Sequence, residues 1–242
     1  MQAPDDRAPP QGAEIRDGRG SGYIHLSRSP TAFIGSAFVA FSPQSVLSAA
    51  HVFSTGVEWR RQLRTATGEP NFSKMRFQLD TCGRSYDIKE VHLYHQGPYR
   101  WGQDIALVIL SEPVCIAALG APIRALAPAD IDRLERLDDR SISLQAHQLL
   151  KRGTSKFGKL VSYGKVLRRS PEFGGDNLLA VSVSTALGAS GGPLISYETG
   201  KAAIFGMLVA EPEDATLPFN IAVAIDRSLE TWARRIVESA TR

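Results

Sequence analysis

Long apolar runs are missing from this sequence. The longest, residues 202–210, falls well short of the ~18 residues that a membrane-spanning helix needs, so we expect no membrane-embedded protein. An excess of one charge is missing too, because 28 basic and 25 acidic residues leave a formal net charge of only +3. These charges are scattered along the chain, which gives no support for binding to nucleic acid or to an anionic membrane.

Cysteine is scarce, with only Cys82 and Cys115 in the chain. Neither lies in a CxxC or Cys/His pattern typical of a metal site. A single disulfide between these two cysteines is one possibility, and a pair of reduced, buried thiols is the simpler interpretation. His92 and His95 would face opposite sides of a strand, so they are poor partners for a metal. We therefore expect neither a metal nor a cofactor, and the redox compartment stays undecided.

The N-terminus lacks the apolar core of a secretory signal, since it reads MQAPDDRAPP. We expect a cytoplasmic protein, or a secreted or periplasmic one if a leader precedes this sequence. Residues 1–22 are rich in proline, glycine and alternating charges and have too little apolar content to fold alone. They predict a flexible arm. No coiled coil or appended peptide-binding domain implies assembly, so we expect a monomer.

From residue 23 onward, short apolar runs alternate with Gly, Pro, Ser and Asn. Their spacing of roughly 10–15 residues and their Val, Ile and Phe content are typical of an all-β sandwich or barrel. The runs are 32–41, 45–48, 74–79, 86–94, 105–110, 141–146, 159–167, 178–183, 193–196, 203–209 and 219–225. A connection over about 117–140 divides them. We predict two six-stranded antiparallel β-barrels, over about 23–116 and 141–225.

Two segments have a helical pattern instead. Residues 129–137 follow Pro128, a favoured first helical residue, and predict a short connecting helix. Over about 227–240, apolar residues recur on one helical stripe, and Asp226 is a suitable N-cap. The members of that stripe are Leu229, Trp232, Ala233, Ile236 and Val237. We therefore predict a C-terminal α-helix that lies on the body of the protein.

The window with the clearest chemical content is Gly188-Ala189-Ser190-Gly191-Gly192. It could be a glycine-rich hairpin turn. It also matches a nucleophile turn, because a serine hydroxyl reacts only when a base takes its proton and donors stabilise the oxyanion that follows. Glycines allow a backbone that aims the N–H groups of Gly188 and Ser190 at one point.

Two further windows supply partners for such a serine. His51 ends the window 48–51, SAAH. A histidine there is more often structural, yet only histidine has an unperturbed pKa near neutrality, as a general base needs. Asp104 opens the apolar run 105–110, where a carboxylate is costly unless paired. It is either a turn residue or the acceptor of a histidine Nδ1–H.

These residues occur in the order His51, Asp104, Ser190, which is the order of chymotrypsin-type triads rather than of α/β-hydrolases or subtilisins. At these positions, and from about Thr31 to the C-terminus, the chain resembles the chymotrypsin/trypsin-like serine protease family. Residues 34–38 and 42–51 resemble its first hairpin and histidine turn, and 206–209 resembles the strand that lines its substrate cleft.

That resemblance implies a function and a role for each residue. His51 would be the base, Asp104 its orienting carboxylate and Ser190 the nucleophile, while Gly188 and Ser190 would form the oxyanion hole. The implied activity is a serine endopeptidase that cleaves a protein or peptide substrate through an acyl-enzyme. The alternatives are an inactive protease-like binding module and an esterase that uses the same triad.

Several positions depart from the animal members of that family. Ala189 stands where they have an aspartate that pairs with a newly cut N-terminus, and Val52 replaces a usual cysteine. These departures resemble the bacterial or fungal type, near the glutamyl-endopeptidase-like branch. Val209 stands where the family usually places a serine that supports the catalytic aspartate, which leaves the support of Asp104 open.

The substrate pocket is less well defined. By the family pattern, Ser184, six residues before Ser190, would lie at the bottom of the primary pocket, with Thr185 and Glu211 nearby. A serine at that position cannot form the ion pair that selects Lys or Arg. Glu211 replaces a glycine and would narrow the pocket or attract a basic group. We expect a preference for a medium-sized apolar residue.

Overall fold

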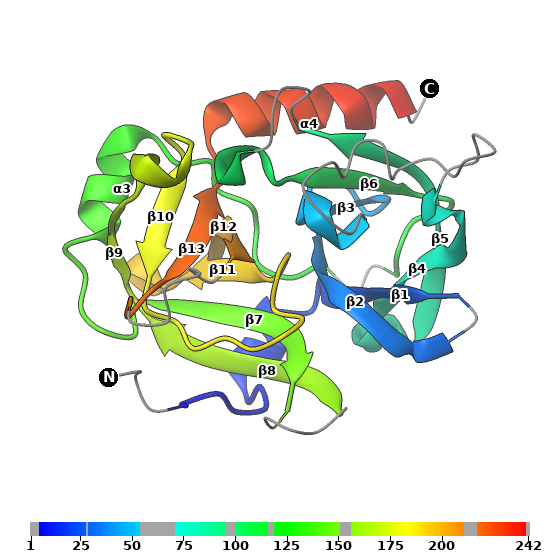
Figure 1. Ribbon diagram of the computed structural model, residues 1–242, viewed down its shortest axis with the longest axis horizontal. Helices are drawn as coiled ribbons and strands as arrows, with labels where there is room; N and C mark the ends of the chain where they lie inside the picture. The colour runs from blue at the N-terminus through cyan, green and yellow to red at the C-terminus, as the bar shows by residue number, and fades with distance from the viewer. Residues whose placement is uncertain are drawn as a thin grey trace.

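Two β-structures joined by a largely irregular connection make up most of the protein (Figure 1). The computed structural model describes residues 5–27, 29–53, 71–94, 100–115, 119–150, 156–210 and 217–240. The first structure is a closed antiparallel barrel with the strand order β1-β2-β3-β6-β5-β4. Its strands are β1 (Ser21–Leu26), β2 (Ser29–Val39), β3 (Ser45–Ser48), β4 (Met75–Leu79), β5 (Arg84–Leu93) and β6 (Ala106–Leu110).

The second structure is a seven-stranded antiparallel sheet with the order β8-β7-β11-β12-β13-β10-β9. Its strands are β7 (Ile142–Leu149), β8 (Phe157–Gly164), β9 (Val166–Arg169), β10 (Leu178–Val181), β11 (Pro193–Ser196), β12 (Ala203–Ala210) and β13 (Asn220–Ala224). Only Lys165 separates β8 from β9, the two outer strands, so they act as one bent strand that joins the ends of the sheet. The predicted all-β fold is confirmed, and the seventh strand arises from this break in the run expected over 159–167.

One strand of the first barrel has no counterpart among the predicted runs. Strand β1 reads SGYIHL, in which Ser21 and His25 dilute the apolar pattern, yet both are buried. Elsewhere the runs and the strands nearly coincide, and 45–48 and 193–196 match β3 and β11 at both ends. The missed strand therefore begins before the barrel boundary expected at residue 23.

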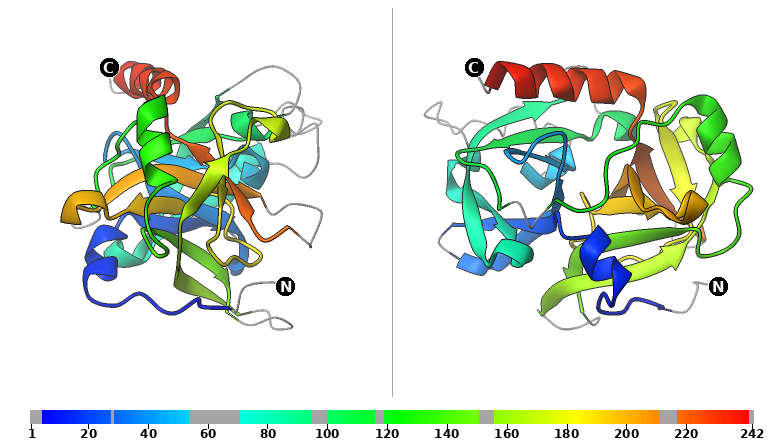
Figure 2. Two further views of the ribbon diagram at one scale, coloured as in Figure 1. Left: turned by 90° about the vertical axis from the view of Figure 1, so that its left-hand side faces the viewer. Right: turned by 180° about the vertical axis from the view of Figure 1, so that it is seen from behind.

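The C-terminal helix α4 (Arg227–Ala240) leaves the second sheet after β13 and crosses back over the first barrel (Figures 1 and 2). Leu229 and Ala233 are buried in the core of that barrel, as the predicted apolar stripe requires. The N-cap prediction is confirmed, because the Leu229 N–H donates to Asp226 Oδ1 at 2.8 Å. Strand β6 is buried along its whole length, with α4 packed against it.

Among the residues that the structure describes, no helix combines the length and the apolar character needed to cross a bilayer.

The connecting helix α3 (Pro128–Leu134) packs on the second sheet through Ile131 and Leu134. It is shorter than the predicted segment 129–137. Salt bridges join Arg124 to Asp130 at 2.7 Å and to Glu198 at 2.9 Å, which ties the connection to the sheet beneath it.

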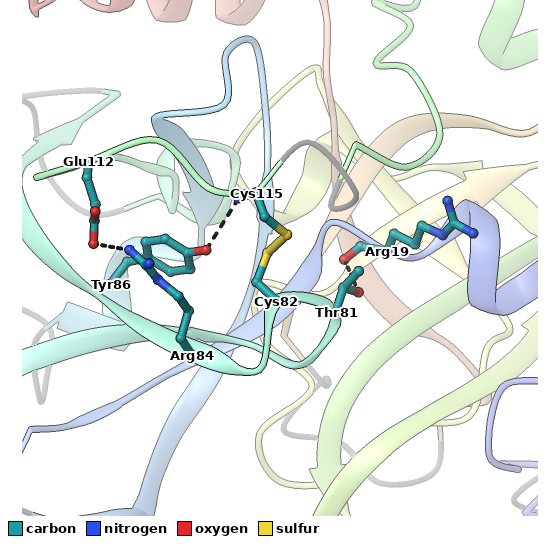
Figure 3. Close-up of a disulfide and its surroundings, with 7 residues drawn as sticks. All are labelled: Arg19, Thr81, Cys82, Arg84, Tyr86, Glu112 and Cys115. Atoms are coloured by element: carbon teal, nitrogen blue, oxygen red, sulfur yellow. Dashed lines mark hydrogen bonds and ion pairs between the residues drawn. A yellow bond between two sulfur atoms is a disulfide. The ribbon is translucent and has the colours of Figure 1, made fainter.

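A disulfide joins Cys82 to Cys115 (Figure 3). Our preference for two reduced thiols was therefore wrong. The bridge links the short 3-10 helix η3 (Asp80–Cys82) to the segment after β6, which lies beside it only in the folded barrel. The Cys115 N–H also donates to the Tyr86 hydroxyl at 3.3 Å. Sequence spacing alone could not reveal this proximity.

Residues 5–20 differ from the predicted flexible arm, because they lie against the second sheet and include the helix α1 (Ala13–Asp17). Ala8 and Val161 of β8 exchange two backbone hydrogen bonds, at 2.9 and 2.7 Å. Arg7 Nη1 donates to the Leu149 carbonyl at 2.9 Å. The arm is held by backbone and polar contacts, which a count of apolar residues does not measure.

Candidate active site

His51 and Asp104, which are distant in the chain, meet at the ends of two neighbouring strands. His51 lies on the 3-10 helix η1 (Ala50–Phe53), directly after β3, and Asp104 lies just before β6. Strands β3 and β6 are hydrogen-bonded neighbours, so their connections emerge side by side. Val52 and Phe53 are buried and anchor η1 in the barrel core. The barrel topology therefore creates this pair.

The Asp104 carboxylate binds His51 at two atoms. Its Oδ2 lies 2.6 Å from His51 Nδ1, and its Oδ1 accepts the His51 backbone N–H at 2.9 Å. Because a carboxylate only accepts, Nδ1 carries the proton and Nε2 of a neutral His51 is left as the base. Asp104 is fully buried, whereas the His51 side chain is 34% exposed. The arrangement orients the imidazole with its free nitrogen available.

The pKa of His51 reflects two opposing effects. Burial disfavours the imidazolium and would lower the pKa of His51. The hydrogen bond and the negative charge of Asp104 act in the other direction, and together they raise the pKa of His51 above its ordinary value of 6.5. Asp104 therefore stabilises the protonated form that a general base becomes after it has accepted a proton.

Ser190 lies in the loop of residues 182–192, which connects β10 to β11 in the second sheet. Gly188 and Gly191 have φ values of +95° and +86°, which L-residues rarely adopt. A Cβ on Gly191 would lie 2.0 Å from the Ser36 carbonyl oxygen. Glycine at position 191 is thus required both by the backbone conformation and by the close approach to the first barrel.

The 182–192 loop meets the histidine segment at Gly35 of β2. A Cβ on Gly35 would lie 2.5 Å from Val52 Cγ2 and 3.3 Å from the Ser190 carbonyl oxygen. Ser190 therefore lies close to the residue that follows His51. Within the described residues, no hydrogen bond joins Ser190 Oγ to His51. Catalytic hydrogen bonds are often long in the absence of substrate, so the lack of this bond is not evidence against a catalytic pair.

Within residues 188–192, the N–H groups of Gly188 and Ser190 have no hydrogen-bond acceptor among the described residues. The neighbouring N–H groups of Ala189, Gly191 and Gly192 each donate to a backbone carbonyl. Two N–H groups on residues that flank a single residue, both without an internal acceptor, are the kind of donors that bind a developing oxyanion.

The peptide groups that carry these two N–H donors are held at their carbonyl ends. The Leu187 carbonyl accepts from the Leu149 N–H at 3.0 Å, and the Ala189 carbonyl accepts from the Gly192 N–H at 2.9 Å. In a trans peptide the C=O and the N–H point in opposite directions. Each bond thus sets the direction of the N–H on the residue that follows. Nothing in the sequence indicates the part played by Leu149.

The residues expected around the substrate pocket are placed only in part. Ser184 and Thr185 are partly exposed residues of the 182–192 loop, and Ser162 Oγ donates to the Ser184 carbonyl at 2.7 Å. Asn220 Nδ2 donates to the Val183 carbonyl at 2.7 Å, which ties β13 to this loop. Glu211 lies outside the described residues.

A second contact between the two β-structures lies next to Asp104. Asn177 Nδ2 donates to the Gly102 carbonyl at 3.0 Å, and a Cβ on Gly102 would lie 2.9 Å from Gly175 Cα. The backbone before Asp104 is therefore braced by the loop before β10, which sequence reasoning missed. Val209, at the position of the expected supporting serine, lies on β12 and is buried in a core cluster that residues of both β-structures share.

Across the part of the chain that the structure describes, no group of three or more His, Cys, Asp or Glu side chains could hold a metal ion.

A closed antiparallel barrel, a second curved sheet and a helix that returns onto the barrel define a chymotrypsin-like fold. The sequence model of the trypsin-like peptidase domain matches residues 35–207, which is more than half of the chain. The chain therefore belongs to the trypsin-like peptidase family. The matched range includes His51, Asp104 and Ser190. A search of curated protein sequences returns no match.

Proposed function

We propose that this protein is a serine endopeptidase in which Ser190 is the nucleophile, His51 the general base and Asp104 the carboxylate that orients the base. The observation that carries this proposal is the bond of 2.6 Å between His51 Nδ1 and the fully buried Asp104 carboxylate. A buried carboxylate that fixes one imidazole tautomer is what a histidine base requires.

The reaction begins when His51 Nε2 takes the proton from Ser190 Oγ as this oxygen attacks the scissile carbonyl carbon. The carbonyl oxygen becomes an oxyanion, which the N–H groups of Gly188 and Ser190 bind. The His51 imidazolium then gives its proton to the leaving amine, and the acyl-enzyme remains. Water attacks the ester by the same route, with His51 again as base, and releases the carboxylic acid product.

The raised pKa of His51 supports this sequence of steps, because Asp104 stabilises the imidazolium that forms in each half-reaction. Loss of one oxyanion donor in such a site costs about 3–4 kcal/mol of transition-state stabilisation. The conformation of the 182–192 loop should therefore affect the rate by about 10²- to 10³-fold.

The substrate we propose is a protein or peptide with a medium-sized apolar residue before the cleaved bond. Ser184 carries no charge to pair with Lys or Arg.

We also propose that the protein is a monomer of the bacterial or fungal type, near the glutamyl-endopeptidase-like branch. Ala189 in place of an aspartate supports that assignment, since activation by an N-terminal salt bridge would have no acceptor.

The test is covalent labelling with a fluorophosphonate, which reacts with a serine hydroxyl only in an assembled site. We expect the wild type to be labelled and Ser190→Ala to be neither labelled nor active toward peptides, with an unchanged melting temperature. The alternative of an inactive binding module is motivated by the lack of a hydrogen bond between Ser190 and His51 among the described residues. A wild type that is not labelled would support this alternative. Labelling with turnover of esters but not of peptides would support an esterase.

A further inference from the structure

One serine of the first barrel contacts the 182–192 loop at two points. Ser36 lies on β2, is fully buried, and has its hydroxyl 2.8 Å from the Gly188 carbonyl oxygen. Its backbone N–H donates to the Ser190 carbonyl at 2.8 Å. We propose that Ser36 is a positioning residue, which holds the Gly188 and Ser190 peptides in the conformation that binds the oxyanion. The inference rests on the function proposed above.

The hydroxyl of Ser36 has a second set of partners on β7, which runs beside β2. It accepts the His147 N–H at 2.9 Å, and it lies 3.0 Å from the His147 carbonyl oxygen. Its single proton is therefore shared between two carbonyls, of which Gly188 is the closer. The His147 N–H fixes the position of the oxygen atom, so the hydroxyl cannot turn away without losing a buried bond.

The carbonyl of Ser36 is held as well. It accepts the Ser48 hydroxyl at 2.7 Å, and Gly191 approaches it so closely that a Cβ could not be accommodated. The amide, hydroxyl and carbonyl of Ser36 are thus all engaged between β3, β7 and the 182–192 loop. A residue bound on every side is a rigid support for the loop that rests on it.

Gly188 is the residue that most needs such a support. Its φ of +95° is open to glycine alone, and glycine can leave this conformation at little steric cost. Among the described residues, the Ser36 hydroxyl is the one donor to the Gly188 carbonyl. Without it, this peptide would keep only the bond of its Ala189 N–H to the Ala186 carbonyl at 3.0 Å, and rotation about Gly188 would disturb the spacing of the two oxyanion donors. A displacement of about 1 Å in such a site can lower a rate by about 100-fold.

Ser21 offers a matched control on the same edge of β7. Its buried hydroxyl donates to the Gln145 carbonyl at 3.0 Å, two residues before His147, and among the described residues it makes no hydrogen bond to the 182–192 loop. Ser36→Ala and Ser21→Ala each remove a buried hydroxyl that bonds the first barrel to β7, at His147 and at Gln145 respectively. Only Ser36→Ala removes a bond to the loop that carries Ser190.

The experiment measures the saturation kinetics of fluorophosphonate labelling in wild type, Ser36→Ala, Ser36→Cys and Ser21→Ala, together with their melting temperatures. For Ser36→Ala we expect the limiting labelling rate to fall about 10- to 100-fold while the half-saturating concentration changes less than about threefold. Ser36→Cys, whose thiol is a weaker donor of similar size, should give an intermediate rate. Ser21→Ala should also lower the melting temperature, by less than Ser36→Ala because its hydroxyl makes fewer hydrogen bonds, and it should keep the wild-type rate.

A wild-type limiting rate in both folded Ser36 variants would overturn the positioning role and leave the proposed function intact. An equal loss of rate in Ser21→Ala would also overturn it, because the effect would then come from general loosening between β2 and β7. Absence of labelling in the wild type would overturn the proposed function, and the role of Ser36 with it. If Ser36→Ala does not fold, the rate of Ser36→Cys relative to Ser21→Ala decides.

Discussion

The two β-structures contribute to the candidate site by different physical means. The first barrel supplies His51 and Asp104, which are held by a short bond between side chains. The second sheet supplies Ser190 from a loop whose shape depends on glycine conformations and on backbone hydrogen bonds. One half of the site thus depends on charge and proton position, and the other on backbone geometry. Each half should be sensitive to a different kind of substitution.

The part of the candidate site that the first barrel supplies should lose most activity when one negative charge is removed and the side-chain shape is kept. We expect Asp104→Asn to lower kcat by about 10⁴-fold, because an amide that donates to Nδ1 favours the wrong imidazole tautomer. Peptide hydrolysis and a near-ultraviolet spectrum check this, and the spectrum should stay that of the wild type. A loss of less than tenfold in a folded variant would contradict the orienting role of Asp104.

The part of the candidate site that the second sheet supplies should lose most activity when one methyl group is added to the backbone of its loop. Gly191→Ala would place a Cβ 2.0 Å from the Ser36 carbonyl, whereas Gly200→Ala has a similar φ of +73° and nothing within 4 Å. We expect Gly200→Ala to cost about 1–2 kcal/mol of unfolding free energy and to leave activity unchanged. Gly191→Ala should cost about 1–3 kcal/mol more and lower kcat by about 100-fold.

Chemical denaturation and peptide hydrolysis of the two glycine variants provide the measurement. Equal stability and equal activity in both would show that the close approach to Ser36 has no effect, and the contrast between the two halves of the site would be lost.

The pH dependence should separate the halves further. In the proposed mechanism activity requires neutral His51, and Asp104 raises the pKa of His51, so the rate should fall as pH drops through a value above 6.5. In Asp104→Asn the acid limb should move below 6.5, because burial then acts on His51 without an opposing charge. Ser36→Ala should keep the wild-type limb, since it changes the other half. A wild-type limb below 6.5 would contradict the effect of Asp104.

The raised pKa of His51 should affect protein stability and activity in opposite directions as pH changes. A raised pKa in the folded state means that the His51–Asp104 pair stabilises the protein fully at pH values below the unfolded pKa of His51. This contribution is lost as pH rises through the folded pKa. The difference in unfolding free energy between wild type and Asp104→Asn should therefore be larger at pH 5 than at pH 9.

The smallest effect on activity should come from the disulfide, which belongs to the first barrel and lies outside the candidate site. Replacement of Cys82 and Cys115 by alanine removes a constraint on the unfolded chain and should lower the unfolding free energy by about 2–4 kcal/mol. Urea denaturation, with and without reductant, measures this loss. We expect kcat/KM to stay within about twofold of wild type. A large loss of activity at full folding would mean that the bridge supports the site directly.

The fold could largely be predicted from the sequence because its signals are local. The apolar runs mark strands such as β3 and β11, and the stripe from Leu229 to Val237 marks α4. Strand β1 escaped prediction because two of its buried residues, Ser21 and His25, are polar. The docking of residues 5–20 escaped for a similar reason, since contacts such as the Ala8–Val161 pairing involve the backbone, which every residue shares.

The candidate site divides in the same way. His51, Asp104 and Ser190 could be selected because their residue types, local windows and order along the chain all restrict the chemistry. The contributions of Leu149, Asn177 and Ser36 had no such signal. A serine in a β-strand is common, and only its neighbours in space distinguish Ser36 from any other.

What the amino-acid sequence determined by itself is most of the strands, the closing helix and the choice of candidate catalytic side chains, because periodicity and residue chemistry are properties of short segments. What the tertiary structure decided is which groups meet. These are the His51–Asp104 bond, the Cys82–Cys115 bridge and the contacts of Ser36 with the 182–192 loop. Such contacts join residues far apart in the chain through directional bonds, and their geometry exists only once both β-structures have formed and packed together.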